Sequence, residues 1–123
     1  MADPIARFHW IVIDSVDPAR IAPFWCALLG VEIWGWFGDD YLTLRNNDGA
    51  VPSIAFQRVP EPKSVKNRVH VDLHVDDMDE AVRTIRSLGG SVVSEERELE
   101  GYRWRVMADP EGNEFCIAPN AGN

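Results

Sequence analysis

The sequence predicts an α+β protein made of two βαβββ units, whose curved mixed sheets pair around a trough with the helices outside. One reason is an internal repeat, in which a helix-like stretch follows Asp17 and again Asp76, and a glycine comes 13 positions after each aspartate. A second reason is that each copy continues into three strand-like segments, and the copies end alike in FQRVP and FCIAP. With 123 residues, 46% of them hydrophobic, the chain is long enough to bury the core of one domain.

The first unit is expected to span about residues 7–60 and to open with a strand that leads to Asp17. Asp17-Pro18 starts a helix, whose apolar face consists of Ile21, Phe24, Trp25 and Leu28. Pro23 falls inside this helix and should delay or kink it. Cys26 lies among apolar helix residues, so we expect it to pack rather than to react. Three strands should follow, over residues 31–36, 41–46 and 51–59.

The second unit is expected over about residues 68–119, after a linker at residues 60–67 with the sequence PEPKSVKN. Its helix has a clear start and stop, because Asp77 and Glu80 form a capping pair and Gly89 ends the apolar periodicity. Three strands are expected after this helix, over residues 91–99, 102–109 and 114–119.

The stretch RVHVDLHVDD, residues 68–77, predicts a strand with one apolar face and one titratable face. The apolar face consists of Val69, Val71, Leu73 and Val75, which should pack under the second helix. The opposite face consists of His70, Asp72 and His74. In the last strand, Phe115 and Ile117 form the apolar face. Glu114 and Cys116 should therefore point toward the trough, as His70, Asp72 and His74 do.

Charge and composition limit the partners that this chain can have. A formal charge of −8 repels phosphate backbones and anionic lipid and favours a cationic guest, so neither nucleic acid nor membrane is an expected partner. The sequence has no membrane-length apolar run and no signal-peptide pattern, which predicts a cytoplasmic protein. Cys26 and Cys116 are accordingly expected to stay reduced.

The duplicated βαβββ pattern, with a DPEGN turn before the last strand, resembles the vicinal oxygen chelate superfamily. It looks most like the glyoxalase-like branch, which is grouped with bleomycin-resistance proteins and extradiol dioxygenases. The resemblance runs from about Arg7 to Pro119, and its most specific stretches are DPARIAPFWCALLG and MADPEGNEFCIAP. The pairing of two sheets around a trough is what this resemblance implies.

The resemblance also implies a divalent metal, held by one side chain on the first strand and one on the last strand of each unit. The matching positions here are His9, Gln57, His70 and Cys116. Cys116 stands where metal-dependent glyoxalases carry a glutamate, and Gln57 is its counterpart in the first unit. Two imidazoles and a thiol suit zinc, whereas nickel, iron or magnesium would want carboxylates. Asp72, His74 and Glu114 are therefore candidates for substitute ligands or for a general base, and Asp72 and Glu114 are the candidate catalytic residues.

Five tryptophans give the trough candidate apolar walls. Trp34 and Trp36 are expected on one face of a strand and Trp104 on the strand beside the last one, where they would suit a planar or aromatic ligand. Plain core packing explains each tryptophan singly at least as well. The ligand-binding set predicted from the sequence is His70, His74, Trp34, Trp36, Gln57, Trp104 and Cys116.

Two functions of different classes remain open on the sequence alone. One is a metal-free protein that binds a small organic molecule in the trough, which the loss of the metal-binding carboxylates favours. The other is a divalent-metal-dependent lyase, isomerase or dioxygenase that acts on a substrate with vicinal oxygens. For the first, His70 hydrogen-bonds a neighbour such as Asp72; for the second, His70 is a metal ligand.

The open sheet edges and the aromatic side chains predict a symmetric homodimer, which the resemblance also implies. Such a dimer would remove unpaired strand edges from solvent. Light scattering at micromolar concentration should give twice the single-chain mass of 13.9 kDa. A mass that stays at the single-chain value would contradict this prediction.

Overall fold

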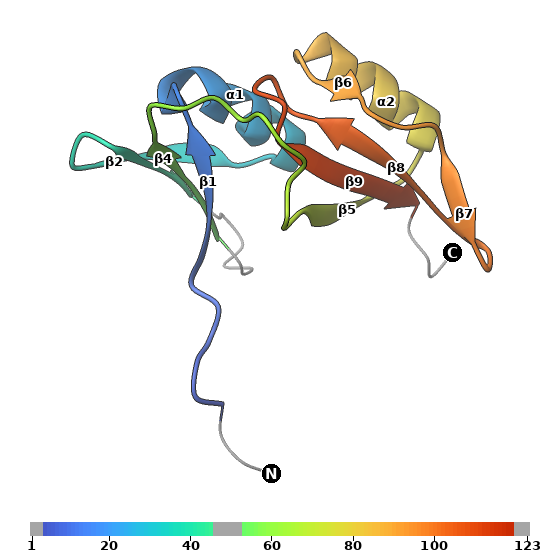
Figure 1. Ribbon diagram of the computed structural model, residues 1–123, viewed down its shortest axis with the longest axis horizontal. Coiled ribbons are helices and arrows are strands. Elements are labelled where there is room, and N and C mark those ends of the chain that lie inside the picture. The colour runs from blue at the N-terminus through green and yellow to red at the C-terminus, as the bar shows by residue number, and fades with distance from the viewer. Residues whose placement is uncertain (1–3, 46–52, 120–123) are drawn as a thin grey trace. The chain divides into compact units, whose positions relative to one another are not determined.

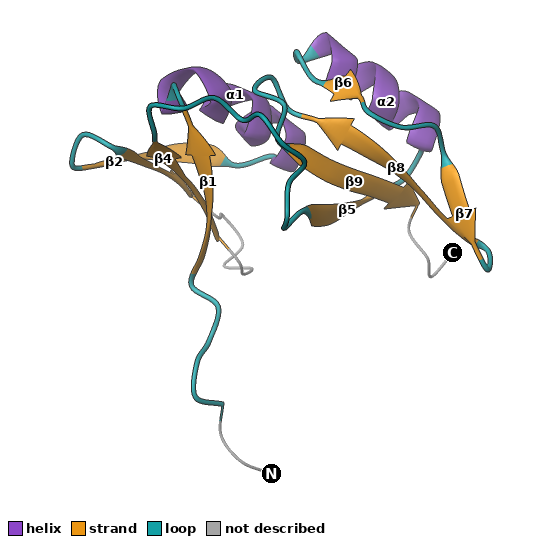
Figure 2. Cartoon of the chain, viewed as in Figure 1, coloured by secondary structure: helices purple, strands orange, loops and turns teal. Residues whose placement is uncertain are grey.

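The computed structural model describes residues 4–45 and 53–119, and within them it has two helices and nine strands in two mixed sheets (Figure 1). The chain divides into two compact units, Met1–Pro62 and Lys63–Asn123. Each unit has one helix and its own sheet (Figure 2), so the α+β class predicted from the sequence is confirmed. Three residues of the expected strands, Asn46, Val51 and Pro52, lie outside the described ranges.

The first unit contains β1 (Trp10–Ser15), α1 (Pro18–Leu29), β2 (Glu32–Phe37), β3 (Tyr41–Arg45) and β4 (Ser53–Arg58). Its sheet has the order β1-β4-β3-β2, in which β1 and β4 run parallel and the other pairs are antiparallel. Leu42, Leu44 and Phe56 share one face and are almost fully buried, and α1 packs against β2, β3 and β4. The opposite face of this sheet carries Tyr41 and Gln57, which pair with each other across β3 and β4.

Helix α1 begins at Pro18, as predicted, and it runs unbroken to Leu29. The expected delay at Pro23 is therefore wrong. A proline inside a helix costs about 3 kcal/mol, whereas burying one large apolar side chain gains about 1.5–3 kcal/mol. Pro23 is exposed, and the turns on both sides of it bury Ile21, Ala22, Phe24 and Trp25. Packing of these neighbours outweighs the missing hydrogen bond.

The second unit contains β5 (Val71–Val75), α2 (Met78–Ser87), β6 (Ser91–Val92), β7 (Arg97–Leu99), β8 (Tyr102–Ala108) and β9 (Glu114–Pro119). The strand order is β5-β9-β8-β6, and β7 pairs separately with β8. The single strand expected over residues 91–99 is thus two short strands. Ser94 lies between these two strands. Its hydroxyl accepts a hydrogen bond from the backbone N–H of Val106 in β8 at 3.2 Å, so a side chain takes the place of a backbone acceptor there.

Helix α2 starts and stops as the sequence predicted. The side chain of Asp77 accepts a hydrogen bond from the N–H of Glu80 at 3.0 Å, which satisfies one free donor of the first turn. At the other end, Gly89 adopts a φ of 102° and the N–H of Gly90 reaches back to the carbonyl of Ile85 at 2.9 Å. The helix packs on β6 and β9 and buries Met78, Val82 and Ile85.

The helices α1 and α2 are 12 and 10 residues long, and no described helix has the length and apolar character to cross a membrane.

The DPEGN turn sets how β9 returns beside β8. Asp109 is 3% exposed, and one of its carboxylate oxygens accepts from the N–H groups of Glu111 and Asn113 at 2.9 and 3.0 Å. Its other oxygen accepts from the Asn113 side-chain amide at 3.0 Å. Gly112 takes a φ of 87°, in the left-handed region that favours glycine. A buried carboxylate with three donors fixes the turn, and with it the register of β9.

One residue of the predicted apolar face does not pack. Val69 is 81% exposed, because β5 begins at Val71 and the alternation of a strand does not extend to residues before it. Val71, Leu73 and Val75 are half-buried. The predicted packing of Val69 under the second helix is therefore wrong.

This difference between Val69 and the helix core can be measured by urea denaturation. Ile85→Ala should lower the free energy of unfolding by about 2–5 kcal/mol, because Ile85 is fully buried and the substitution leaves a cavity. Val69→Ala should change it by less than about 0.5 kcal/mol. Comparable losses for the two variants would contradict the packing described.

Candidate functional site

The pairing of β5 with β9 places the titratable residues of the second unit side by side. In this parallel pair Asp72 is level with Cys116, and Leu73 is level with Ile117. Phe115 and Ile117 are fully buried, on the same face as Leu73. Since adjacent strand residues project to opposite faces, Asp72 and Cys116 lie on the face away from these core residues. The register agrees with the alternation of the sequence.

Three different donor groups meet on this face. His70, Asp72 and Cys116 each offer one atom, and these three atoms lie within 4.8 Å of one another. The His70 Nε2 atom is 3.3 Å from Asp72 Oδ1, and the two side chains are 47% and 56% exposed. Cys116 is 6% exposed. The arrangement is a buried thiol beside an imidazole and a carboxylate that solvent reaches, and we call these three residues the donor cluster.

The thiol of Cys116 is held in its protonated form. Burial raises its pKa above the ordinary value, and the negative charge of Asp72 and a hydrogen bond with that carboxylate raise it further. A thiol that keeps its proton at neutral pH is a weak nucleophile. It becomes a strong ligand when a metal ion displaces the proton.

Glu114 lies on the same strand but is engaged elsewhere. Its carboxylate accepts a hydrogen bond from Lys66 Nζ at 2.8 Å and lies 3.7 Å from Lys63 Nζ. The hydrogen bond from Lys66 is the largest cause that lowers the pKa of Glu114, and the charges of Lys66 and Lys63 act in the same direction. A carboxylate with a lowered pKa is a poor general base. Asp72 is therefore the stronger of the two predicted candidates for a ligand or a base.

Two further predicted residues share the face of the donor cluster. His74 is exposed and level with Ala118 in β9. Val106 is paired with Cys116, so Trp104, two residues earlier in β8, projects from the same face. The rings of Trp104 and Tyr102 are stacked, with centroids 5.7 Å apart and an interplanar angle of 29°. The second unit by itself thus offers a polar end and an aromatic end on one face.

The structure does not bring His9 and Gln57 together. His9 is exposed and precedes β1, and its ring lies 5.5 Å from that of Trp10. Gln57 is level with Asp14, five residues further along β1, which corresponds to about 16 Å at the rise of an extended strand. His9 thus differs from His70, which lies close to Cys116. The cause is spacing, because His9 stands eight residues before Asp17, whereas His70 stands six residues before Asp76.

Asp14 is a residue that the sequence interpretation missed. Its place beside Gln57 in the first unit is the same as the place of Asp72 beside Cys116 in the second. Both units therefore set an aspartate of the first strand next to the last-strand position where the resemblance implies a metal ligand. The signal was present in the sequence, in the alternation of Trp10, Val12 and Asp14 along the strand, and it required only the correct pairing register.

The two tryptophans of β2 do not share a regular strand face. The pairing with β3 shifts between Ile33 and Gly35, which makes Trp34 the extra residue of a bulge. Trp36 is paired with Leu42 and so belongs to the face on which α1 packs. The guanidinium carbon of Arg58 lies 5.4 Å from the centroid of the Trp36 ring. We do not include Trp36 in the proposed site for this reason.

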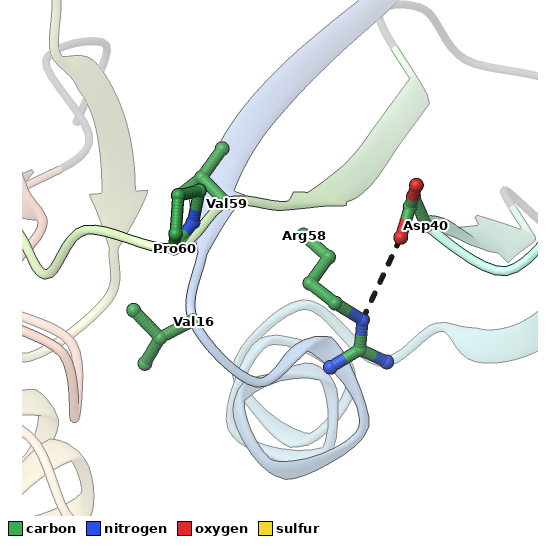
Figure 3. A pocket seen from close by; sticks show the side chains of 5 residues that line it. All are labelled: Val16, Asp40, Arg58, Val59 and Pro60. Carbon is green, nitrogen blue, oxygen red and sulfur yellow. Dashed lines mark ion pairs between the residues drawn. The ribbon is translucent and has the colours of Figure 1, made fainter.

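A pocket of about 450 Å³ lies in the first unit (Figure 3). Its lining consists of Val16, Asp40, Arg58, Val59 and Pro60. Arg58 Nε lies 3.8 Å from Asp40 Oδ1, and both side chains are substantially exposed, so this charged pair is weak. None of the predicted site residues lines this pocket. We assign the candidate site to the donor cluster, because a chemically distinct set of groups converges there.

The donor cluster is chemically suited to a divalent transition metal. Imidazole nitrogen, carboxylate oxygen and thiolate sulfur are all zinc ligands, with bonds of about 2.0–2.3 Å. In a tetrahedral site, bonds of that length place the donor atoms about 3.3–3.8 Å apart. The present spread of up to 4.8 Å is about 1 Å wider, so the three side chains would draw together by about that distance around a bound ion.

Comparison with known proteins relates this fold and site to a family. Residues 10–118 match the model of the family described as a glyoxalase-like domain. None of the curated proteins compared matches the sequence.

Solved structures share the fold at low sequence identity. A member of the glyoxalase/bleomycin resistance protein/dioxygenase superfamily from Sphaerobacter thermophilus is 22% identical, with a TM-score of 0.72 over 94% of this chain and 98% of its own. A family enzyme of the same description from Burkholderia phytofirmans is 17% identical, with a TM-score of 0.72 over 89% and 95%. The oxidase ChaP-H2 is 17% identical, with a TM-score of 0.65 over 95% of both chains.

The family match covers most of the sequence, including both helices and all nine described strands except the last residue of β9. The structural neighbours have the same fold over nearly the whole chain. This chain therefore belongs to the glyoxalase-like domain family, within the vicinal oxygen chelate superfamily.

Proposed function

We propose that this chain binds a small organic molecule on the face of its second sheet that carries the donor cluster, and that His70, Asp72 and Cys116 hold a divalent transition metal there. The observation that carries the proposal is the convergence of the three donor atoms within 4.8 Å. The sequence alone favoured a metal-free site, because both expected glutamate positions lack a carboxylate. Asp72 changes that balance, since the neighbouring strand supplies a carboxylate directly beside Cys116.

The donor set favours zinc over magnesium or calcium. A thiolate and an imidazole prefer borderline and soft ions, whereas magnesium and calcium take oxygen ligands. Three protein ligands leave one position of a tetrahedral ion open, as in catalytic zinc sites. When bound, such an ion supplies Lewis-acid polarisation of the oxygens of a guest molecule.

The residues around the donor cluster select the guest. Trp104 and Tyr102 form a stacked aromatic pair on the same face, which suits a flat or partly aromatic molecule. The negative charge of the chain favours a guest that is neutral or cationic over a polyanion. That the guest lies in a trough between the two sheets stays a prediction from the family resemblance.

A metal-free binding site is the second candidate, and one observation favours it. His70 and Asp72 already contact each other at 3.3 Å, and Asp72 also accepts from the protonated thiol. The three groups can satisfy one another without an ion. In that case they would offer hydrogen bonds to a polar group of the guest.

Zinc binding separates the two candidates. Wild-type protein purified without an affinity tag should bind one zinc ion in isothermal titration calorimetry, with release of the Cys116 proton. His70→Ala and Cys116→Ser should each weaken binding on the order of a hundredfold, because loss of a ligand exceeds the roughly 10–100-fold effect of an outer-shell residue. Metal analysis after dialysis should find the ion in the wild type.

The matched control is His74→Ala, which removes an exposed imidazole from the same strand and face but leaves the donor cluster complete. It should bind zinc like the wild type. Absence of zinc binding by the wild type, or equal binding by Cys116→Ser, would favour the metal-free candidate.

A further inference from the structure

In the part of the chain that the structure describes, the segment that carries His70 contacts the sheet through His70 itself, which meets Asp72, and through residues that meet Glu114. Among residues 63–70, Lys63 and Asn67 are half-buried and the other six are exposed. Val65 and Val69 in this segment are 74% and 81% exposed, so apolar packing does not hold it. Its attachment to the sheet is therefore polar.

Apart from the His70–Asp72 contact, three described contacts attach this segment to the sheet, and they end on Glu114. The backbone N–H of Glu114 donates to Asn67 Oδ1 at 2.9 Å. Lys66 Nζ donates to one carboxylate oxygen of Glu114 at 2.8 Å, and Lys63 Nζ lies 3.7 Å from the other. The Glu114 side chain is 12% exposed, and those of Lys63 and Lys66 are 23% and 74% exposed, so solvent screens the Lys63 contact less than the Lys66 contact.

The attachment lies close to the donor cluster at both ends. Glu114 is the first residue of β9, two residues before Cys116 and on the same face. Asn67 is three residues before His70, so at most about 11 Å of extended chain separates their backbones. β5 begins directly after His70 and lies at the end of the strand order, where β9 is its one partner among the described strands. An unanchored segment would leave the start of this strand free to fray.

We propose that Glu114 and Asn67 are positioning residues for the donor cluster: together they pin the segment of residues 63–70 to β9 and so hold the His70 imidazole beside Asp72 and Cys116. This inference rests on the proposed function where it concerns metal binding. It gives Glu114 a role other than the general base or substitute ligand expected from the sequence. Groups that orient ligands without touching the metal contribute about 10–100-fold to metal affinity in other sites.

The test uses two variants that weaken the attachment in different ways. Asn67→Ala removes the acceptor of the Glu114 N–H and leaves all charges in place. Glu114→Gln removes the charge and leaves the backbone hydrogen bond. Each should weaken zinc binding about tenfold. The zinc affinity of the double variant should fall by less than the product of the two single fold-changes, because both substitutions act on one attachment.

A measurement on the zinc-free protein tests the positioning itself. Nuclear Overhauser contacts between the His70 imidazole and the side chains of Asp72 and Cys116 should be present in the wild type and weakened in both variants. Asn67→Asp, which restores an acceptor oxygen, should recover part of the contact. Glu96→Gln is the control, since it removes an exposed ion pair with Arg103 in the same unit, and it should behave like the wild type.

The outcomes are distinguishable. Unchanged Overhauser contacts and zinc affinity in Asn67→Ala would overturn the positioning role. Weaker zinc binding in Glu114→Gln alone would also overturn it, because loss of a nearby negative charge would then explain the effect. If the wild type binds no zinc but the contacts weaken in both variants, the proposed metal site fails and the positioning role stands.

Discussion

The parallel pairing of β5 with β9 is the constraint on which the candidate site depends. This register sets Leu73 beside Ile117 on the buried face and thereby sets Asp72 beside Cys116 on the other. A slip of one residue would turn every side chain of β5 to the opposite face and would expose its apolar residues. Burial of Phe115, Ile117 and the apolar face of α2 therefore stabilises the register that sets Asp72 beside Cys116.

The two units use one architecture for different chemistry. Each pairs its first and last strands in parallel and sets an aspartate of the first strand beside a polar residue of the last, Asp14 with Gln57 and Asp72 with Cys116. The second unit adds an imidazole, because its linker carries His70 up to the start of β5. In the first unit His9 lies at the far end of β1 from Gln57. The donor cluster is therefore complete within the second unit alone.

Much of the fold could be predicted from the sequence, because its signals are local. The repeat of aspartate and glycine marked both helices, and Asp77, Gly89 and Asp109 act in the caps and turn as their residue types predict. The failures have physical causes of longer range. Helix α1 continues past Pro23 because the residues on both sides of it are buried. Strand β5 begins two residues after Val69, the first residue of the predicted apolar face, so Val69 is exposed to solvent.

The site was less predictable than the fold. The sequence pointed to Cys116 by counting and to Asp72 as a candidate substitute ligand. It did not show that Asp72 lies directly beside Cys116, because strand pairing brings together two segments more than 40 residues apart. The attachment of Lys66 and Asn67 to Glu114 carries no sequence signature either. Lys66 and Asn67 belong to a segment whose sequence has no helix or strand pattern, and their contacts with Glu114 lie close to His70 in the chain.

X-ray absorption at the zinc edge tests the central claim most directly, because it reports which atoms surround a bound ion. Protein loaded with one equivalent of zinc should show one sulfur neighbour at about 2.3 Å, with the remaining neighbours nitrogen or oxygen at about 2.0–2.2 Å. The sulfur neighbour should disappear in Cys116→Ser and persist in Cys26→Ser. A zinc environment without sulfur in the wild type, or one that Cys116→Ser leaves unchanged, would contradict the assignment of the site to His70, Asp72 and Cys116.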